Sequence, residues 1–257
     1  MKPEHFLARH SLFTRAELAA ALPGRSPGTI NAHLTRWRGQ GRIVRVKNEL
    51  YVRQDTPAPD VVALASRMAP DAAVSHHTAL EVYGCAQSLF TRLTFVTWTQ
   101  TREVEFLGHR LVPVRPDVAL DRSGRRDAWL EIVDREGLQV RVTSLERTLV
   151  DVLDRPALAG GVVEVWRSLA ALPAVDPVAV LEYVRVLDSR TVAARVGFFL
   201  DARREELAVP TSTLEALQEL LPGQPVHLDR AQGGCLNRRW RLYVPVGLAG
   251  PPEETEA

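Results

Sequence analysis

The sequence predicts an α+β fold in two parts, a small N-terminal domain and a larger mixed α/β domain. Three observations predict it: a helix running directly into a short hairpin near the N-terminus, basic charge concentrated in the same region, and a later order of helices, strands, helices and strands. The expected domains are residues 1–54 and 60–248, followed by a disordered tail at 249–257. Gln54 to Pro59 (QDTPAP) is the expected linker, since proline keeps such segments extended.

The stretch from residue 26 to residue 53 organises the N-terminal domain. Ser26 can cap free backbone amides, and Pro27 suits the first position of a helix. The apolar residues that follow recur at i, i+4 and i+7, which places them on one helical face: Ile30, Leu34 and Trp37. Gly41 is expected to end this helix. Alternating apolar residues then predict strands at 43–46 and 50–52 around a Lys47-Asn48 turn.

Two more helices are expected before this stretch. Residues 3–12 form the first, with Phe6, Leu7 and Leu12 facing inward. Thr14 and Glu17 have the spacing of a capping box, which starts the second. Its expected inward residues are Ala16, Leu18, Ala19 and Leu22. Helices followed by a basic hairpin indicate a winged helix-turn-helix, a DNA-binding domain.

The expected DNA-binding side chains lie on the exposed face of the third helix and in the hairpin. Small or polar residues and an arginine on such a helix can enter a major groove, and the hairpin cations can contact phosphates. The candidates are Arg25, Gly28, Thr29, Ala32, Thr35, Arg36, Arg42, Arg45, Lys47 and Asn48.

The charge distribution favours the same function. Residues 1–54 contain ten Lys or Arg and three Asp or Glu, a formal charge of +7, whereas the remainder contains 22 and 28, a charge of −6. Such asymmetry is typical of a nucleic-acid-binding module joined to another domain. A merely solvated basic surface is the alternative.

The second domain begins with two helical patterns, continues with strands, returns to helices and ends with strands. The helical patterns are residues 60–68, 75–84, 144–154, 162–172, 177–187, 190–207 and 211–220. The strand patterns are residues 93–98, 104–114, 129–142, 225–229 and 238–246, of which 104–114 and 129–142 read as hairpins.

The residues of the second domain argue against an enzyme. The chain's two lysines are Lys2 and Lys47, so this domain lacks a phosphate-loop, Schiff-base or nuclease lysine. His76-His77 lacks further ligands at metal spacing, and a polar helix start with one histidine partly buried is favoured over a metal site. Cys85 and Cys235 predict neither a metal site nor a disulfide framework. We therefore expect no catalytic residue, no metal and no cofactor.

The role of three groups of charged residues in the second domain remains open. Glu146, Arg147 and Asp151 share one helix, and Arg195 and Asp201 share another that is otherwise apolar. They form either a catalytic cluster or an internal ion-pair network, and the lack of a nucleophile favours the network. Arg238, Arg239 and Arg241 flank Trp240, where a second contact with nucleic acid or a partner is an alternative to simple packing.

Nothing in the sequence indicates a membrane or an exported protein. No apolar run approaches the ~20 residues of a membrane span. The N-terminus MKPEHFLARH lacks the apolar region of a signal peptide. The expected location is the cytoplasm.

Several stretches together resemble one family. They are FTRAELAAAL, TINAHLTRWRGQGRIVRV and ELYV in the first domain, and SHHTALEVYG, TSLERTLVDVLDRPALAGG, RTVAARVGFFLD and RRWRLYVPV in the second. Over about residues 6–246 the chain resembles the AbiEi family, the antitoxins of bacterial AbiE-type (type IV) toxin–antitoxin systems. The near-total use of arginine instead of lysine departs from many members of that family.

The resemblance implies a winged helix that represses the antitoxin–toxin operon, with its own promoter region as the double-stranded DNA partner. It also implies that the second domain counteracts a co-encoded toxin of the nucleotidyltransferase class, in phage defence; whether the two proteins touch is open. Two alternatives remain: a one-component transcription factor whose second domain binds a small ligand, and an enzyme targeted by a winged helix. A downstream toxin gene, or a ligand that raises the melting temperature, would separate the first two.

Overall fold

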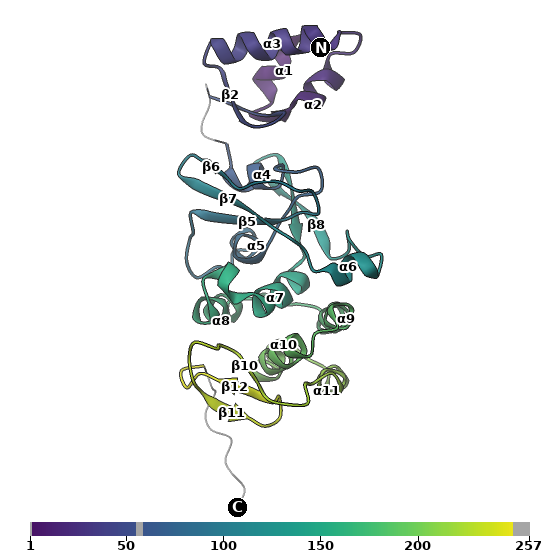
Figure 1. The fold of residues 1–257 in the computed structure, drawn as a ribbon, viewed down its shortest axis with the longest axis vertical. Helices are drawn as coiled ribbons and strands as arrows, with labels where there is room; N and C mark the ends of the chain where they lie inside the picture. The colour runs from purple at the N-terminus through teal and green to yellow at the C-terminus, as the bar shows by residue number, and fades with distance from the viewer. Residues whose placement is uncertain (1, 55–58, 249–257) are drawn as a thin grey trace, which may run out of the picture. The chain divides into compact units, whose positions relative to one another are not determined.

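The computed structural model describes residues 2–54 and 59–248, and these residues form an α+β fold of eleven α-helices, one 3-10 helix and twelve strands (Figure 1). The chain divides into two compact units. The first comprises Met1–Val74, Thr91–Arg115 and Ile132–Arg141, and the second comprises Ser75–Phe90, Pro116–Glu131 and Val142–Ala257. The expected linker includes residues 55–58, which lie outside the described residues, and the expected tail at 249–257 lies outside them as well. The expected domain boundary therefore stays a prediction.

Three helices and a three-stranded antiparallel sheet form the N-terminal part of the first unit. In chain order they are α1 (Pro3–Arg9), β1 (Leu12–Thr14), α2 (Arg15–Ala21), α3 (Pro27–Gly39), β2 (Ile43–Lys47) and β3 (Leu50–Arg53). The strand order is β1-β3-β2, so β3 is central and β2 lies at one edge. The expected third helix and hairpin are confirmed.

The first strand corrects one expectation. Leu12 was expected in the first helix, but α1 ends at Arg9 and Leu12 lies in β1, opposite Val52. Since Leu12 and Phe13 are both buried, an extended backbone paired with β3 buries two adjacent side chains and satisfies their peptide groups. A local apolar pattern cannot reveal a pairing partner about forty residues away.

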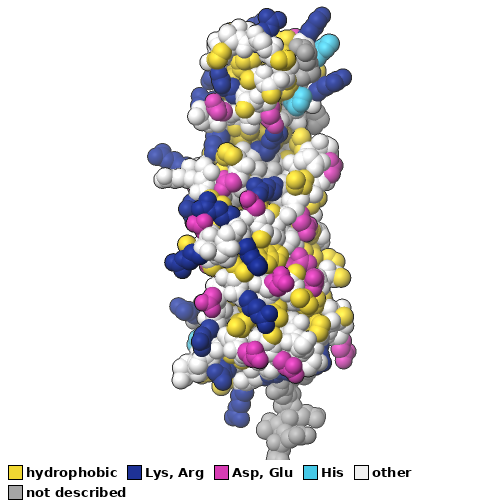
Figure 2. Space-filling view, turned by 90° about the vertical axis from the view of Figure 1, so that its right-hand side faces the viewer, with side chains coloured by type: hydrophobic (Ala, Val, Ile, Leu, Met, Phe, Trp, Pro, Cys, Tyr) yellow, Lys and Arg dark blue, Asp and Glu magenta, His cyan; other side chains and the backbone are white. Residues whose placement is uncertain are grey.

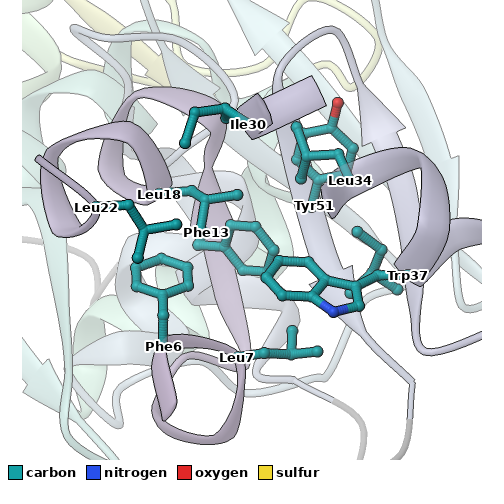
Figure 3. Packing of buried hydrophobic residues seen from close by; sticks show 10 residues of the cluster. Phe6, Leu7, Phe13, Leu18, Leu22, Ile30, Leu34, Trp37 and Tyr51 are labelled. Atoms are coloured by element: carbon teal, nitrogen blue, oxygen red, sulfur yellow. The ribbon is translucent and has the colours of Figure 1, made fainter. Parts of the chain in front are cut away.

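The apolar faces of the three helices meet the sheet in a single core (Figure 3). Phe13 lies between Phe6 and Trp37 in this view, and its ring meets that of Phe6 edge-on with a centroid separation of 5.2 Å. Ile30, Leu34 and Trp37 are all buried, as their spacing predicts. Ala16 was expected inside but is exposed, because the buried residue in α2 is Leu18.

Both expected helix starts are confirmed. Thr14 Oγ1 accepts a hydrogen bond of 3.2 Å from the Glu17 amide, while the Thr14 amide donates to Glu17 Oε2 at 2.6 Å, which completes the capping box. Ser26 Oγ accepts from the Thr29 amide at 3.2 Å. Each such cap stabilises its helix by about 1 kcal/mol.

A six-stranded sheet follows, in the order β6-β7-β5-β4-β9-β8. Its strands are β4 (Ala73–Val74), β5 (Arg92–Val96), β6 (Val104–Phe106), β7 (His109–Val114), β8 (Leu130–Arg135) and β9 (Leu138–Thr143), and α4 (Val61–Ala65) precedes them. The two expected hairpins are present, β6 with β7 and β8 with β9. The short β4 and the parallel pairing of β5 with β7 were not expected, because neither leaves a local signal.

Helices dominate the second unit (Figure 1). They are α5 (His76–Val82), α6 (Val118–Arg122), α7 (Leu145–Asp154), the 3-10 helix η1 (Pro156–Ala159), α8 (Val162–Ala170), α9 (Pro177–Leu187), α10 (Arg190–Ala202) and α11 (Thr211–Glu219). A small sheet of order β10-β12-β11 completes it: β10 (Val226–His227), β11 (Cys235–Asn237) and β12 (Leu242–Val244).

Two boundaries in this unit differ from the predicted ones. Helix α10 ends at Ala202, five residues before the expected end. The expected strand at 238–246 is limited to β12, because Trp240 and Arg241 form a turn in which Arg241 has a positive φ of 49°. In the described part of the chain, no helix has the length and apolar character needed to cross a membrane.

Candidate nucleic-acid interface

One long side of α3 is exposed. Gly28, Ala32, Thr35 and Gly39 follow one another at helical spacing, opposite the buried Ile30/Leu34/Trp37 face. Small residues here leave the helix backbone accessible, and Thr35 adds a hydroxyl group. Thr29 is half-buried at the helix start, and Arg25 is exposed in the turn between α2 and α3. Figure 2 shows Lys and Arg side chains projecting from the N-terminal helices at the top of the view.

Two of the expected DNA-binding arginines pair with an acid on α1. Arg42 Nη1 lies 2.7 Å from Glu4 Oε2, and Arg36 Nη2 lies 3.4 Å from Glu4 Oε1. The Trp37 indole N–H also donates to Glu4 Oε1, at 3.1 Å. The hydrogen bond from Arg42, with that from Trp37, lowers the pKa of Glu4 below its usual value. Glu4 was missed by the sequence reasoning because Arg36 and Arg42 lie 32 and 38 residues away.

The hairpin positions its own side chains. Arg45 Nε donates to the Lys47 carbonyl at 3.2 Å, and Arg45 Nη2 donates to Asn48 Oδ1 at 2.5 Å. Arg45 is therefore held by the turn while remaining exposed. Lys47 Nζ donates to the Met68 carbonyl and, at 2.8 Å, to Thr101 Oγ1, and burial lowers its pKa. Within the first unit, Lys47 thus has partners other than the phosphate expected for it.

A groove lies between the C-terminal half of α3 and strand β2. Its volume is about 600 Å³. Its lining residues are Thr35, Arg38, Gly39, Gly41, Ile43, Val44, Arg45 and Gln54. The lining contains two guanidinium groups and no carboxylate. Arg38 was not among the predicted site residues, although its position three residues after Thr35 places both on one side of α3.

The Arg147 and Asp151 pair of the second unit belongs to its interior. Arg147 is 1 % exposed, lies 3.3 Å from Asp151 and donates to the Ala128 carbonyl at 3.2 Å. The Tyr183 hydroxyl donates to Asp151 Oδ1 at 2.7 Å. Burial, with the Asp151 charge, raises the pKa of Tyr183. Glu146 lies apart from this network, with Oε1 accepting from the Asp176 amide at 3.3 Å.

The charges of α10 also serve packing. Arg195 Nη1 donates to the Leu153 and Asp154 carbonyls at 2.9 and 3.0 Å, so it satisfies groups at the C-terminal end of α7. Asp201 Oδ2 accepts from the Trp240 indole N–H at 2.8 Å, and Trp240 is fully buried. These contacts favour the ion-pair and packing interpretation for this helix over a catalytic cluster.

The arginines around Trp240 differ in their contacts. Arg239 Nη1 lies 3.2 Å from Asp201 Oδ1, and Arg241 Nη1 donates to the Pro222 carbonyl at 2.7 Å. The Arg238 side chain is exposed and has no ion-pair or hydrogen-bond partner among the described residues. Since Trp240 is buried, its ring is not accessible for base stacking.

His77 is buried and lies between two half-buried glutamates. Its Nδ1 lies 2.9 Å from Glu81 Oε1, its Nε2 lies 3.3 Å from Glu164 Oε1, and its ring stacks on Phe90 with centroids 3.9 Å apart. His76 is buried as well, so the expectation of a single, partly buried histidine was wrong. Both ring nitrogens of His77 lie within hydrogen-bonding distance of carboxylates. The described residues contain no group of three or more His, Cys, Asp or Glu side chains able to hold a metal ion.

Comparisons with known proteins show a fold relationship. No protein-family model matches the chain, and no curated protein sequence does. The crystal structure of the RV2827C protein from Mycobacterium tuberculosis is similar with a TM-score of 0.57 and 14 % sequence identity, over 93 % of this chain and 88 % of that one. At this identity the likeness concerns the fold alone.

Proposed function

We propose that the N-terminal part of the chain is a winged helix-turn-helix that binds double-stranded DNA, and that the protein is a cytoplasmic transcriptional autorepressor. One observation carries the proposal: the exposed face of α3 adjoins a groove lined by Arg38 and Arg45 and by no carboxylate. The order helix, strand, helix, helix, strand, strand also fits this class of domain.

The physical chemistry supports a duplex as the ligand. A major groove about 12 Å wide admits one α-helix, and the small side chains of Gly28 and Ala32 allow α3 to approach closely. Cations beside the helix then neutralise phosphates and release counterions, which supplies most of the non-specific affinity. Residues 1–54 contain more basic than acidic residues, as expected for a domain whose helix enters the groove while its cations bind phosphates.

We further propose that the second domain expected from the sequence, residues 60–248, acts as an antitoxin against a co-encoded toxin of the nucleotidyltransferase class. This role rests on the family resemblance of the sequence. Its charged clusters around Arg147 and Asp201 are engaged in internal contacts, which supports a binding or regulatory role over catalysis.

The first experiment is fluorescence anisotropy of the full-length protein with the duplex upstream of its own gene, beside a scrambled duplex, at several salt concentrations. Tight binding that prefers the upstream duplex and falls steeply with salt is expected. Weak binding, equal for both duplexes, would rule out autorepression.

Co-expression tests the antitoxin role separately. A neighbouring gene for a nucleotidyltransferase-class protein should arrest growth when expressed alone, and this chain should restore growth. A chain truncated after residue 54 serves as the control, since it lacks the whole expected second domain at residues 60–248. Absence of rescue by the full chain would remove the antitoxin role and leave DNA binding untouched.

A further inference from the structure

We propose that the groove between α3 and β2 holds the sugar–phosphate backbone of duplex DNA, with Arg38 and Arg45 as its two cations. The inference rests on the proposed DNA-binding function and specifies its site. It adds Arg38, which the sequence did not indicate, to the expected Arg45. It assigns the main backbone contact to this pair and not to Arg36 and Arg42, which the sequence also indicated.

Arg38 is the first element of this site. It lies on α3 three residues after Thr35 and directly after the buried Trp37, so the helix presents it beside the hairpin. Its side chain is exposed and has no hydrogen-bond or ion-pair partner among the described residues. A guanidinium in this state presents all of its donors to an anion.

Arg45 faces Arg38 from the other wall of the groove and is oriented in advance. Two of its nitrogens are held by the Lys47 carbonyl and Asn48 Oδ1. Its third, Nη1, has no partner in the part of the chain that the structure describes. A guanidinium already fixed by its neighbours loses less rotamer entropy when it binds, which favours a phosphate contact at this position.

The groove is shaped for an extended anion. Gly39 lies in its wall, and a Cβ atom built there meets no heavy atom within 4 Å, so the space in front of the helix is open. Thr35 and Gln54 add neutral polar groups beside the two arginines. A volume of about 600 Å³ exceeds that of one phosphate group, which suits a stretch of nucleic-acid backbone better than a free ion.

Arg36 and Arg42 are in a different electrostatic position. Both guanidinium groups share the Glu4 carboxylate, so part of their charge is already neutralised within the protein. The Trp37 indole holds the same carboxylate in place. Phosphate binding by these arginines would compete with Glu4, whereas binding by Arg38 and Arg45 has no carboxylate to displace.

The test measures the salt dependence of DNA binding by the full-length protein. The plot of log affinity against log salt has a negative slope. Arg38→Ala and Arg45→Ala should each make this slope less steep by about 0.9, equally for the upstream and scrambled duplexes. Arg38→Lys should keep the wild-type slope, because it keeps the charge. The matched control is Arg9→Ala, which removes one exposed charge from α1 outside the groove lining.

A second variant blocks the groove without removing a cation. Gly39→Glu places a carboxylate in open space, so the melting temperature should be retained while affinity for both duplexes falls at least about tenfold by like-charge repulsion. Gly39→Gln, similar in size and uncharged, should bind more tightly than Gly39→Glu. Equal affinities of Gly39→Glu and the wild type would overturn the proposal.

The outcomes separate this inference from the function on which it rests. If the wild type binds duplex DNA and the slopes of Arg38→Ala and Arg45→Ala equal that of Arg9→Ala, the groove assignment is wrong and the DNA-binding function stands. If the wild type binds neither duplex, both the groove assignment and the DNA-binding function are wrong. If it prefers a duplex RNA of the same sequence, the assignment to DNA is overturned.

Discussion

Trp240 donates its indole N–H to Asp201 at 2.8 Å, and this bond anchors the turn between β11 and β12 to helix α10. The ring needs space on the helix surface. Gly197, one turn before Asp201, provides it, because a Cβ built there would lie only 2.0 Å from Trp240 Cζ3. Packing thus explains three residues of α10. Gly197 and Asp201 accommodate Trp240, and Arg195 donates to a carbonyl at the C-terminal end of α7.

Gly197→Ala should therefore destabilise the protein, even though alanine is the better helix former. Overpacking of a filled core costs about 1–3 kcal/mol, and the urea midpoint should fall accordingly. Gly39→Ala is the matched control in another helix. Its Cβ meets open space, and its free energy of unfolding should be unchanged or rise by up to about 1 kcal/mol. Similar behaviour of the two variants would contradict the role given to Gly197.

Asp151→Ala should be strongly destabilising, because it leaves the buried guanidinium of Arg147 without its carboxylate. Loss of one partner from a buried ion pair costs about 3–5 kcal/mol. Tyr183→Phe removes only a hydrogen bond to that carboxylate and should cost about 1.5–3 kcal/mol. Urea denaturation of both variants checks this order. A smaller loss for Asp151→Ala than for Tyr183→Phe would show that Arg147 does not depend on Asp151.

Glu164 should stabilise the protein in a pH-dependent way. Burial opposes its ionisation, but hydrogen bonds from Ser88 and His77 outweigh burial and lower its pKa below the ordinary value of 4.5. An acid with a lowered folded-state pKa adds stability above its unfolded pKa and loses it as pH falls through the folded-state value. The wild type should therefore exceed Glu164→Gln in unfolding free energy by about 1–3 kcal/mol at pH 7.

The same comparison in acid provides the check on Glu164. The difference between wild type and Glu164→Gln should shrink below pH 4.5, the window set by the lowered pKa. Glu215→Gln, a substitution at an exposed position in α11, serves as the control and should show little difference at either pH. A Glu164 difference that stays constant between pH 7 and pH 3 would exclude ionisation of Glu164 as its cause.

Glu4→Gln should raise the affinity for DNA while lowering stability slightly. The substitution removes the carboxylate shared by Arg36 and Arg42, so both guanidinium groups become available to phosphates. Exposed ion pairs contribute about 0–1 kcal/mol each, which sets the scale of the expected loss on urea denaturation. Anisotropy titrations should show a higher affinity and a steeper salt dependence than the wild type. Weaker binding would mean that Glu4 holds these arginines in a conformation that DNA requires.

Much of the N-terminal fold was predictable because its signals are local. The Thr14–Glu17 capping box, the Ser26 cap and the buried face of α3 each depend on residues three to seven positions apart, and all three are confirmed. The two hairpins of the six-stranded sheet followed from turns with adjacent alternating strands. β1, β4 and the parallel pairing of β5 with β7 were missed, because each depends on a partner that is not adjacent in the sequence.

The candidate site divides in the same way. The sequence by itself determined that α3 has an exposed face of small and polar residues and that the basic charge lies around it, since helical spacing and composition require no knowledge of the chain path. Only the tertiary structure decided which arginines are engaged. Glu4 meets Arg36 and Arg42 because α1 packs against α3, and Arg38 meets Arg45 across a groove because β2 folds back beside the same helix. Electrostatic pairing depends on distance in space, and the packing of the core sets that distance.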